Sequence, residues 1–202
     1  MPALSHGGDG GIGPGAADVD GRAPFSADAV RRSGGYLMRI QHGADGVPIG
    51  ATVSALVRAD ADTLAEVIAD VSGYAGKVPM LHRVRRTGDR VAVELRFGIS
   101  VFSVRFEFVA DARYDDTARW LELAWVSGEP RDLFIRFDLA DAGRAEETLL
   151  HVTIRFDVLS LGWLVKFFLK HHPEIRYGVV PGAALTLFHG LARVAEQRGR
   201  GG

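Results

Sequence analysis

Between residues 82 and 158 the sequence repeats one pattern several times: large apolar residues stand at every second position, with polar residues between them. In one such run, Val91, Val93, Leu95 and Phe97 alternate with charged or small residues. Side chains of a β-strand point alternately to opposite faces, so the pattern is typical of a strand with one apolar and one polar face. The same alternation recurs in the runs 102–108, 120–125, 133–139 and 150–158. Short turn sequences separate the runs, and such links favour an antiparallel meander with one face toward water.

Before the meander, the sequence predicts a hairpin and a short helix. Residues 36–42 and about 49–58 have strand composition and are joined by the turn sequence Ala44-Asp45-Gly46. In 60–69 the apolar residues recur at three- and four-residue intervals, which indicates a short helix. Gly and Pro residues in 70–79 limit the next segment to one helical turn.

Helical patterns return after the meander. Residues 163–169 are strongly apolar and precede His171-His172-Pro173, a sequence that ends a helix. A longer helix is expected from about Pro181 to Gln197, with Pro181 in the first turn, where proline is tolerated. Its apolar residues recur at helical spacing, so this helix can dock on the sheet.

Composition bounds the classes of function. Hydrophobic residues make up 47% of the 202 residues, enough for a sizeable core. The 24 Lys and Arg residues nearly balance the 25 Asp and Glu residues and are scattered, which argues against a nucleic-acid partner. The chain contains no Cys, so disulfides, thiolate metal sites and cysteine nucleophiles are excluded. The first residues do not resemble a secretory signal, and the expected location is cytoplasmic.

The chain divides into a tail and one domain. Residues 1–34 are dominated by Gly, Ala and Asp and carry few large apolar side chains, so we expect a flexible tail with at most a short helix near its end. Residues 35–199 are expected to form one folded domain.

A short motif adds a resemblance to this element order. The segment 68–86 contains Asp70, Tyr74, Val78 and Pro79, and it resembles the Asp-x-x-x-Tyr-x-x-x-Val-Pro signature of the polyketide cyclase and coenzyme Q-binding branch of the START-related helix-grip superfamily (SRPBCC). The resemblance covers about residues 36–198 and implies an α+β helix-grip fold. In that fold a curved antiparallel sheet of about six to eight strands wraps around a long C-terminal helix, and two short helices follow the first long strand. It also implies a deep cavity between sheet and helix that holds lipids, sterols, quinones or polyketides.

The alternation and the resemblance together predict the cavity residues. The candidates are the apolar residues of the expected inner face and of the last helix: Val93, Leu95, Phe97, Phe106, Phe108, Leu123, Trp125, Ile135, Phe137, Val152, Ile154, Phe156, Leu185 and Phe188. Tyr74 and Tyr177 are added because a phenol pairs an apolar ring with one hydrogen-bonding tip. The same apolar pattern is found in any sheet that packs on a helix, so the cavity itself rests on the resemblance.

Catalytic and metal-binding residues are not predicted. The polar residues of the runs fall on the opposite face, where a solvated surface with cross-strand ion pairs explains them: Glu94, Arg96, Arg105, Glu107, Glu122, Arg136, Asp138, His151, Arg155 and Asp157. Adjacent histidines such as His171 and His172 do not share a face, and no acidic ligand stands at a recognised spacing. No cofactor is expected.

Three functions remain open at this stage. The first is a binder or carrier of a hydrophobic small molecule, such as a lipid, a sterol or an isoprenoid quinone. The second is a polyketide aromatase or cyclase that uses the same cavity and needs polar groups in it. The third is a protein-interaction module, which a surface patch of Arg83, Arg85, Arg86 and Arg90 would favour. Residues 161–177 fit a lid over the cavity, a transient membrane contact or a helix that closes the domain.

Overall fold

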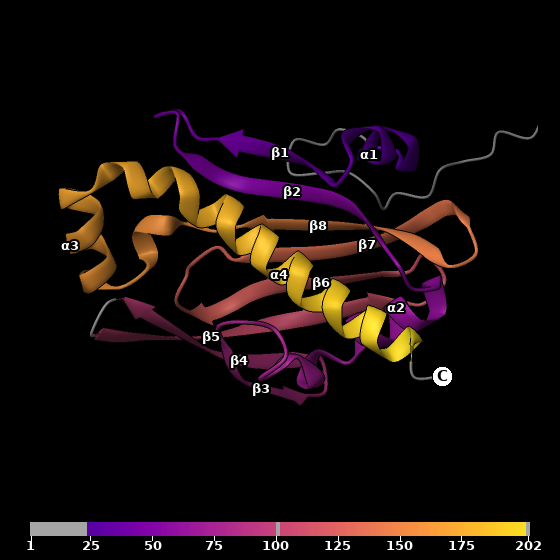
Figure 1. Ribbon diagram of the computed structural model, residues 1–202. Helices are drawn as coiled ribbons and strands as arrows, with labels where there is room; N and C mark the ends of the chain where they lie inside the picture. Colours follow the sequence, from indigo (N-terminus) through magenta and orange to yellow (C-terminus); the bar gives the residue numbers. More distant parts are fainter. Residues whose placement is uncertain (1–23, 100–101, 201–202) are drawn as a thin grey trace, which may run out of the picture.

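The computed structural model of the protein describes residues 24–99 and 102–200 and contains an eight-stranded sheet with strand order β1-β2-β8-β7-β6-β5-β4-β3 (Figure 1). The strands are β1 (Tyr36–His42), β2 (Pro48–Val57), β3 (Leu81–Thr87), β4 (Arg90–Ile99), β5 (Phe102–Asp115), β6 (Trp120–Gly128), β7 (Phe134–Arg144) and β8 (Glu147–Arg155). The helices are α1 (Ala27–Ser33), α2 (Ala61–Ala69), α3 (Trp163–His171) and α4 (Arg176–Gly199), with the 3₁₀ turns η1 (Val71–Tyr74), η2 (Val158–Ser160) and η3 (Pro173–Ile175).

The strand order confirms the predicted hairpin and meander. β1 pairs with β2, and each strand from β3 to β7 pairs with the next strand along the chain, all antiparallel. Between β2 and β3 the chain passes through α2 and η1 to the far edge of the sheet, so the free side of β2 pairs with β8, where Val53 lies opposite Val152. The α+β architecture and the two short helices after the first long strand are confirmed.

Helix α4 runs across one face of the sheet, which we call the inner face (Figure 1). It packs mainly on β2 and also contacts α2 and β8. Its buried residues include Val180, Ala184, Phe188, Leu191 and Ala195, which recur at three- and four-residue intervals. By length and composition alone the helical stretch Pro173–Gly199 is apolar enough to cross a membrane. Here this apolar stripe is buried against the sheet, so α4 is the core helix of the domain.

The start of α4 corrects the prediction made for Pro181. The helix begins at Arg176, and Pro181 lies inside it. Pro173 opens η3, which leads directly into α4, and so takes the first-turn position expected for Pro181. Pro181 lacks the N–H that would bond the carbonyl of Tyr177, but Tyr177 is exposed, and water can satisfy its carbonyl.

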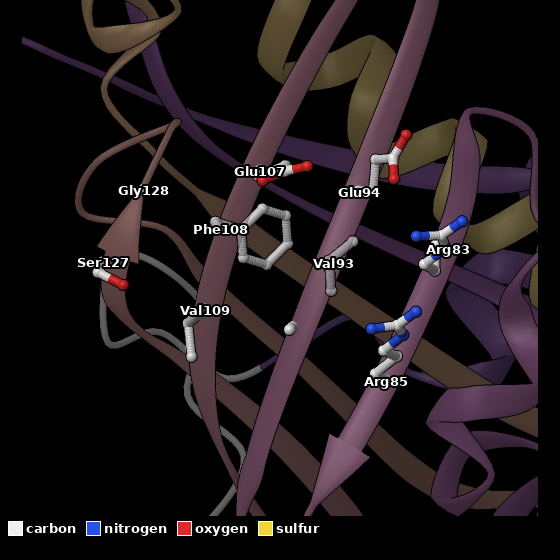
Figure 2. Close-up of a pocket in the computed structure, with 10 residues that line it drawn as sticks. Arg83, Arg85, Val93, Glu94, Glu107, Phe108, Val109, Ser127 and Gly128 are labelled. Carbon is white, nitrogen blue, oxygen red and sulfur yellow. The ribbon is translucent and has the colours of Figure 1, made fainter.

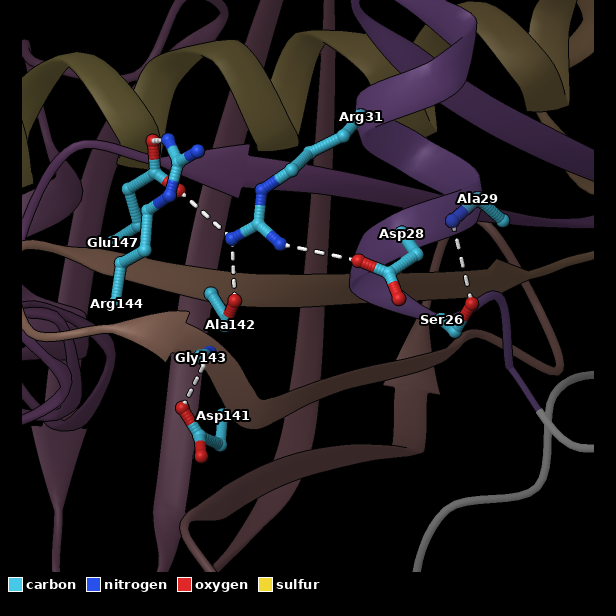
Figure 3. A network of polar contacts seen from close by, with 9 residues as sticks. All are labelled: Ser26, Asp28, Ala29, Arg31, Asp141, Ala142, Gly143, Arg144 and Glu147. Atoms are coloured by element: carbon cyan, nitrogen blue, oxygen red, sulfur yellow. Dashed lines mark hydrogen bonds and ion pairs between the residues drawn. The ribbon is translucent and has the colours of Figure 1, made fainter.

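Helix α1 belongs to the folded unit, although the sequence boundary lies after it at residue 35. Ser26 caps the helix by accepting a hydrogen bond from the Ala29 N–H at 3.3 Å. Arg31 donates to the carbonyl of Ala142 and to the Glu147 carboxylate, at 3.0 Å for the latter (Figure 3). The side chain of Val30 is buried. Burial of Val30 and the contacts of Arg31 together dock this short helix on the sheet. The flexible tail expected for residues 1–23 lies outside the described residues.

The outer face, opposite α4, carries the polar residues of the strands as predicted, but part of it is buried. Glu94, Asp138 and His151 are each less than a tenth exposed. Glu94 lies among arginines, with Arg96 at 2.9 Å and Arg105 at 3.4 Å. The expectation of a fully solvated polar face is therefore wrong at these three positions, because long neighbouring side chains and the docked α1 cover parts of the face.

Candidate functional site

A cavity of about 390 Å³ lies between the inner face of the sheet, α3 and the first half of α4. Figure 1 shows α3 at the end of the sheet where α4 begins. The lining side chains come from the strands, from the loops before β3 and β7, and from the segment 161–187: Pro79, Met80, Leu81, Leu95, Phe106, Phe108, Pro130, Leu133, Ile135, Ile154, Phe156, Leu161, Val165, Phe168, Leu169, Ile175, Val179, Gly182, Ala183 and Leu187. Ile175 is 47% exposed although it lines the cavity, so solvent reaches the cavity at η3.

The residues of α4 explain why the cavity lies at this end. Val179, Gly182 and Ala183 face the cavity, and all three are small. Further along the helix, Phe188 and Leu191 are buried and fill the corresponding space. A stretch of small side chains on the helix leaves the large strand residues opposite without close partners, and a hollow results.

Every described residue that lines the cavity is apolar. The cavity therefore offers no titratable side chain and no side-chain hydrogen bond to a molecule inside it. Proton transfer requires a positioned acid or base within hydrogen-bonding reach. The arrangement can bury an apolar molecule, and the described lining carries no group that would act on it chemically.

Of the predicted cavity residues, Leu95, Phe106, Phe108, Ile135, Ile154 and Phe156 line the cavity. They lie on β4, β5, β7 and β8 or directly after β8, and residues of α3 line the same cavity. Contact of these side chains with a ligand stays a prediction.

The other predicted residues lie elsewhere. Leu123, Phe137, Val152 and Phe188 are buried in the packed core, and Leu185 and Trp125 are half-buried against it. Val93 of β4 is also buried in the core, and it borders a second hollow described below. Phe97 belongs to β4, and its side chain lies outside the described part of the structure.

The two tyrosines are not part of the cavity wall. The Tyr74 hydroxyl donates to the carbonyl of Ile68, and burial raises the pKa of Tyr74. Tyr177 is 54% exposed at the start of α4. Anchoring of the chain after α2 is therefore the structural role of Tyr74.

The motif that carried the resemblance is mainly structural. Asp70 caps η1 by accepting from the Gly73 N–H at 3.0 Å, and Arg198 at the end of α4 lies 3.2 Å from it. Val78 is buried against Gly190 of α4, where an added Cβ would lie 2.8 Å from a Val78 methyl carbon. Pro79 alone lines the cavity. The motif thus fixes the turn before β3 to the C-terminal helix.

Sequence reasoning missed the cavity residues outside the strands. Met80 and Pro130 lie in loops, and Met80 has a φ of 71°. Val165, Phe168 and Leu169 lie on α3, inside the segment 161–177 that the sequence singled out as a lid, a membrane contact or a closing helix. The apolar excess of that segment was the available signal, whereas the two loop residues follow no periodic pattern.

A second hollow of about 370 Å³ lies on the outer face, across β3 to β6 (Figure 2). Arg83 and Arg85 stand side by side on β3 at its edge, and Glu94 and Glu107 stand opposite them on β4 and β5. Figure 2 thus shows both signs of charge around one shallow groove.

The four arginines considered for a basic patch do not form one uncompensated surface. Arg90 lies 3.3 Å from the Asp111 carboxylate. Arg83 and Arg85 share one hollow with Glu94 and Glu107, whereas Arg86 donates at 3.0 Å to the neutral carbonyl of Gly88. This mixed charge does not favour an interaction module that binds through a basic surface.

A buried serine–histidine pair also lies on the outer face. Ser54 of β2 is 2.8 Å from the Nδ1 atom of His151 on β8, and burial lowers the pKa of His151 to about 4. Ser54 is fully buried and lines none of the cavities described here, so no substrate can reach its hydroxyl. The pair is a satisfied polar contact of the sheet rather than a nucleophile and its base. Among the described residues, no cluster of His, Asp and Glu is placed to hold a metal ion.

Comparison with known proteins shows the fold and nothing finer. No protein-family model matches the sequence, and a search of curated proteins found no match. Solved structures do match. The Zhui aromatase/cyclase from Streptomyces sp. R1128 is 18% identical with a TM-score of 0.55, over 80% of this chain and 96% of that one. A START superfamily protein from Mycobacterium smegmatis is 18% identical with a TM-score of 0.53, over 75% and 97% of the two chains. At such identities the likeness defines the architecture, and function has to be argued from the site.

Proposed function

The chain has the helix-grip fold of the START-related superfamily, and we propose that it binds a hydrophobic small molecule in the cavity between the sheet, α3 and α4. The observation that carries this proposal is the wholly apolar lining of the described cavity. Its volume of about 390 Å³ falls in the range of small-molecule sites, which is roughly 300–1,000 Å³.

The lining also constrains the chemistry of the ligand. A polar atom that enters the cavity finds no side-chain partner among the described residues, and an unpaired buried polar group costs about 1–3 kcal/mol. The buried part of the ligand should therefore be hydrocarbon, as in a lipid, a sterol or the isoprenoid chain of a quinone. Its polar end would remain in water near Ile175, where the cavity opens.

An aromatase or cyclase activity is the less favoured alternative. A polyketide carries many carbonyl and hydroxyl groups, each of which would lose its hydrogen bonds to water on entering this cavity. Cyclisation also needs groups that move protons, and the described lining contributes none. The comparison with the Zhui aromatase/cyclase supports the fold of such enzymes, whereas the composition of the cavity supports binding.

Native mass spectrometry of the purified chain, followed by solvent extraction, identifies any ligand that copurifies. Affinity for a homologous series of fatty alcohols then tests the cavity directly. Each added CH₂ that becomes buried contributes about 0.8 kcal/mol, so the Kd should fall about fourfold per carbon. The decrease should stop once the chain fills the cavity. An empty protein that binds no sterol, quinone or fatty alcohol would overturn the proposal.

A substitution that fills the cavity sharpens this test. Ala183→Phe adds a ring where α4 faces the cavity and should weaken binding of the longer alcohols at least tenfold. His189→Phe places the same ring at an exposed position of α4 and should leave the Kd unchanged. Loss of binding in both variants would point to damage of the helix rather than to filling of the cavity.

As a carrier, the protein would also exchange its ligand with a second phase. The segment 161–177 forms part of the cavity wall and is the natural place for that exchange, either with a membrane or as a lid.

A further inference from the structure

The large apolar side chains that remain exposed are concentrated at one end of the molecule. Among the described residues, five of the seven exposed large hydrophobics lie between 159 and 177: Leu159, Trp163, Phe167, Ile175 and Tyr177. Trp163 is 77% exposed, which is unusual for the largest apolar side chain. A monomer rarely leaves such a group of side chains in water unless the surface has a partner.

Helix α3 has one side that faces the cavity and another side that faces outward. Val165, Phe168 and Leu169 face the cavity. Trp163, Lys166, Phe167 and Lys170 recur at the spacing of one helix face and are all exposed. The side that faces the ligand and the side that faces outward therefore lie one helix diameter apart.

The charge of the outward side defines the kind of partner. Lys166 and Lys170 are exposed and form no ion pair with any described residue. Glu174 is the single acidic residue between 163 and 177, and it lies 3.2 Å from the Nδ1 atom of His172, so the two lysines outnumber the acidic groups of this segment. Aromatic residues with lysines on one short helix are the composition of segments that lie in the interface of an anionic membrane.

We propose that this surface, made of Leu159, Trp163, Phe167, Ile175 and Tyr177 with Lys166 and Lys170, docks on an anionic lipid bilayer and exchanges the ligand there. The exchange part rests on the proposed function, whereas docking does not. Because Ile175 belongs both to the docking surface and to the cavity wall, docking brings the opening of the cavity to the lipid. A second copy of the chain is a poorer occupant, since a symmetric contact would bring the lysines of both copies together.

Vesicle sedimentation with the full-length chain tests docking. Vesicles of phosphatidylglycerol and phosphatidylcholine should bind the protein at low salt, and binding should fall as salt rises, because salt screens the lysines. Pure phosphatidylcholine vesicles should bind at least tenfold more weakly. Equal binding to both vesicles, or no binding to either, would overturn the proposal.

Variants locate the contact. The double variant Trp163→Ala with Phe167→Ala, and separately Lys166→Glu with Lys170→Glu, should each lose at least tenfold in affinity for the anionic vesicles. Tyr36→Ala removes an exposed aromatic residue of β1 that is not part of the docking surface. It serves as the matched control and should keep full binding. Vesicle binding that survives both double variants would overturn the assignment. So would a dimer in sedimentation equilibrium that the Trp163 and Phe167 substitutions abolish.

A soluble probe distinguishes the proposed membrane docking from the proposed binding of a ligand in the cavity. Trp163 and Phe167 do not line the cavity, so their double variant should bind a fluorescent fatty alcohol in solution like the unmodified chain, while transfer of the probe to vesicles slows at least tenfold. If the protein docks on vesicles but does not bind the probe, the proposed function and the exchange step are rejected, whereas docking itself stands. Probe binding with unchanged transfer in the variant would reject docking as the route of exchange.

Discussion

The two ends of the inner face are built from the same alternating strands, yet one end is packed and the other is hollow. At the packed end, Leu191 and Ala195 of α4 are fully buried, and so are Leu64 and Ile68 of α2. At the hollow end, Val179 and the following small residues of α4 face the cavity of about 390 Å³. The strands thus determine which face is apolar, and the helices determine how much of that face is filled.

The largest expected difference between the ends comes from one substitution made at both. Leu191→Ala removes a fully buried side chain and should lower the free energy of unfolding by about 3 kcal/mol, through lost burial and a new void. Leu187→Ala, one helical turn earlier, enlarges a cavity that already exists and should cost about 1 kcal/mol. Urea denaturation of both variants gives the two values. Equal losses would mean that the hollow end is closed in solution.

The outer face offers a second comparison along one strand. His151 of β8 is buried behind the packed end, whereas Arg155, four residues later on the same face, is exposed. Burial lowers the pKa of His151 from 6.5 to about 4. Below about pH 6.5 the unfolded chain therefore binds a proton that the folded state does not bind until about pH 4. The free energy of unfolding therefore falls as the pH is lowered through this window, and at about pH 5 it is about 2 kcal/mol below its value at neutral pH.

His151→Gln retains a polar side chain that can bond Ser54 and removes the titration. Denaturation curves of the parent and the variant between about pH 4 and 7 should show the loss in the parent only. A pH dependence that persists in the variant would assign the effect to other groups.

The smallest expected effects come from two glycines of α4. An added Cβ at Gly190 would lie 2.8 Å from a methyl carbon of Val78, so Gly190→Ala should destabilise the protein by about 1 kcal/mol despite the better helix propensity of alanine. At Gly182 an added Cβ meets no atom within 4 Å, and Gly182→Ala should stabilise by about 0.5–1 kcal/mol. Opposite shifts in Tm would confirm that α4 is tightly held at one end only.

The fold was predictable where the signal is local. A two-residue period in the strands and a three- to four-residue period in the helices follow from backbone geometry, and both β4 and α2 lie where their patterns indicate. Helix α4 was misplaced at its start because Pro173 and Pro181 both fit a first turn, and only the path of η3 decides between them.

The candidate site was predictable only in part, because the strand pattern shows which face is apolar but not which part of that face the helices cover. Ile135 and Phe137 stand on the same side of β7, and the sequence treats them alike. Ile135 lines the cavity and Phe137 is sealed in the core, because α2 and the second half of α4 cover only one end of the strand face. Neither the reach of a helix across a sheet nor a loop residue such as Met80 is encoded in a periodic pattern.

The pairing of β2 with β8 has a consequence for how the chain is made. Val53 pairs with Val152, about a hundred residues later in the chain, and α4, which follows β8, packs mainly on β2. Contacts this distant in sequence slow folding, because a long loop must close before they form. On the ribosome, the free edge of the β1–β2 hairpin therefore stays unpaired until β8 has emerged. The cavity wall includes residues of β8, α3 and α4, so the cavity can form, and a ligand can enter it, only after these elements have been synthesised.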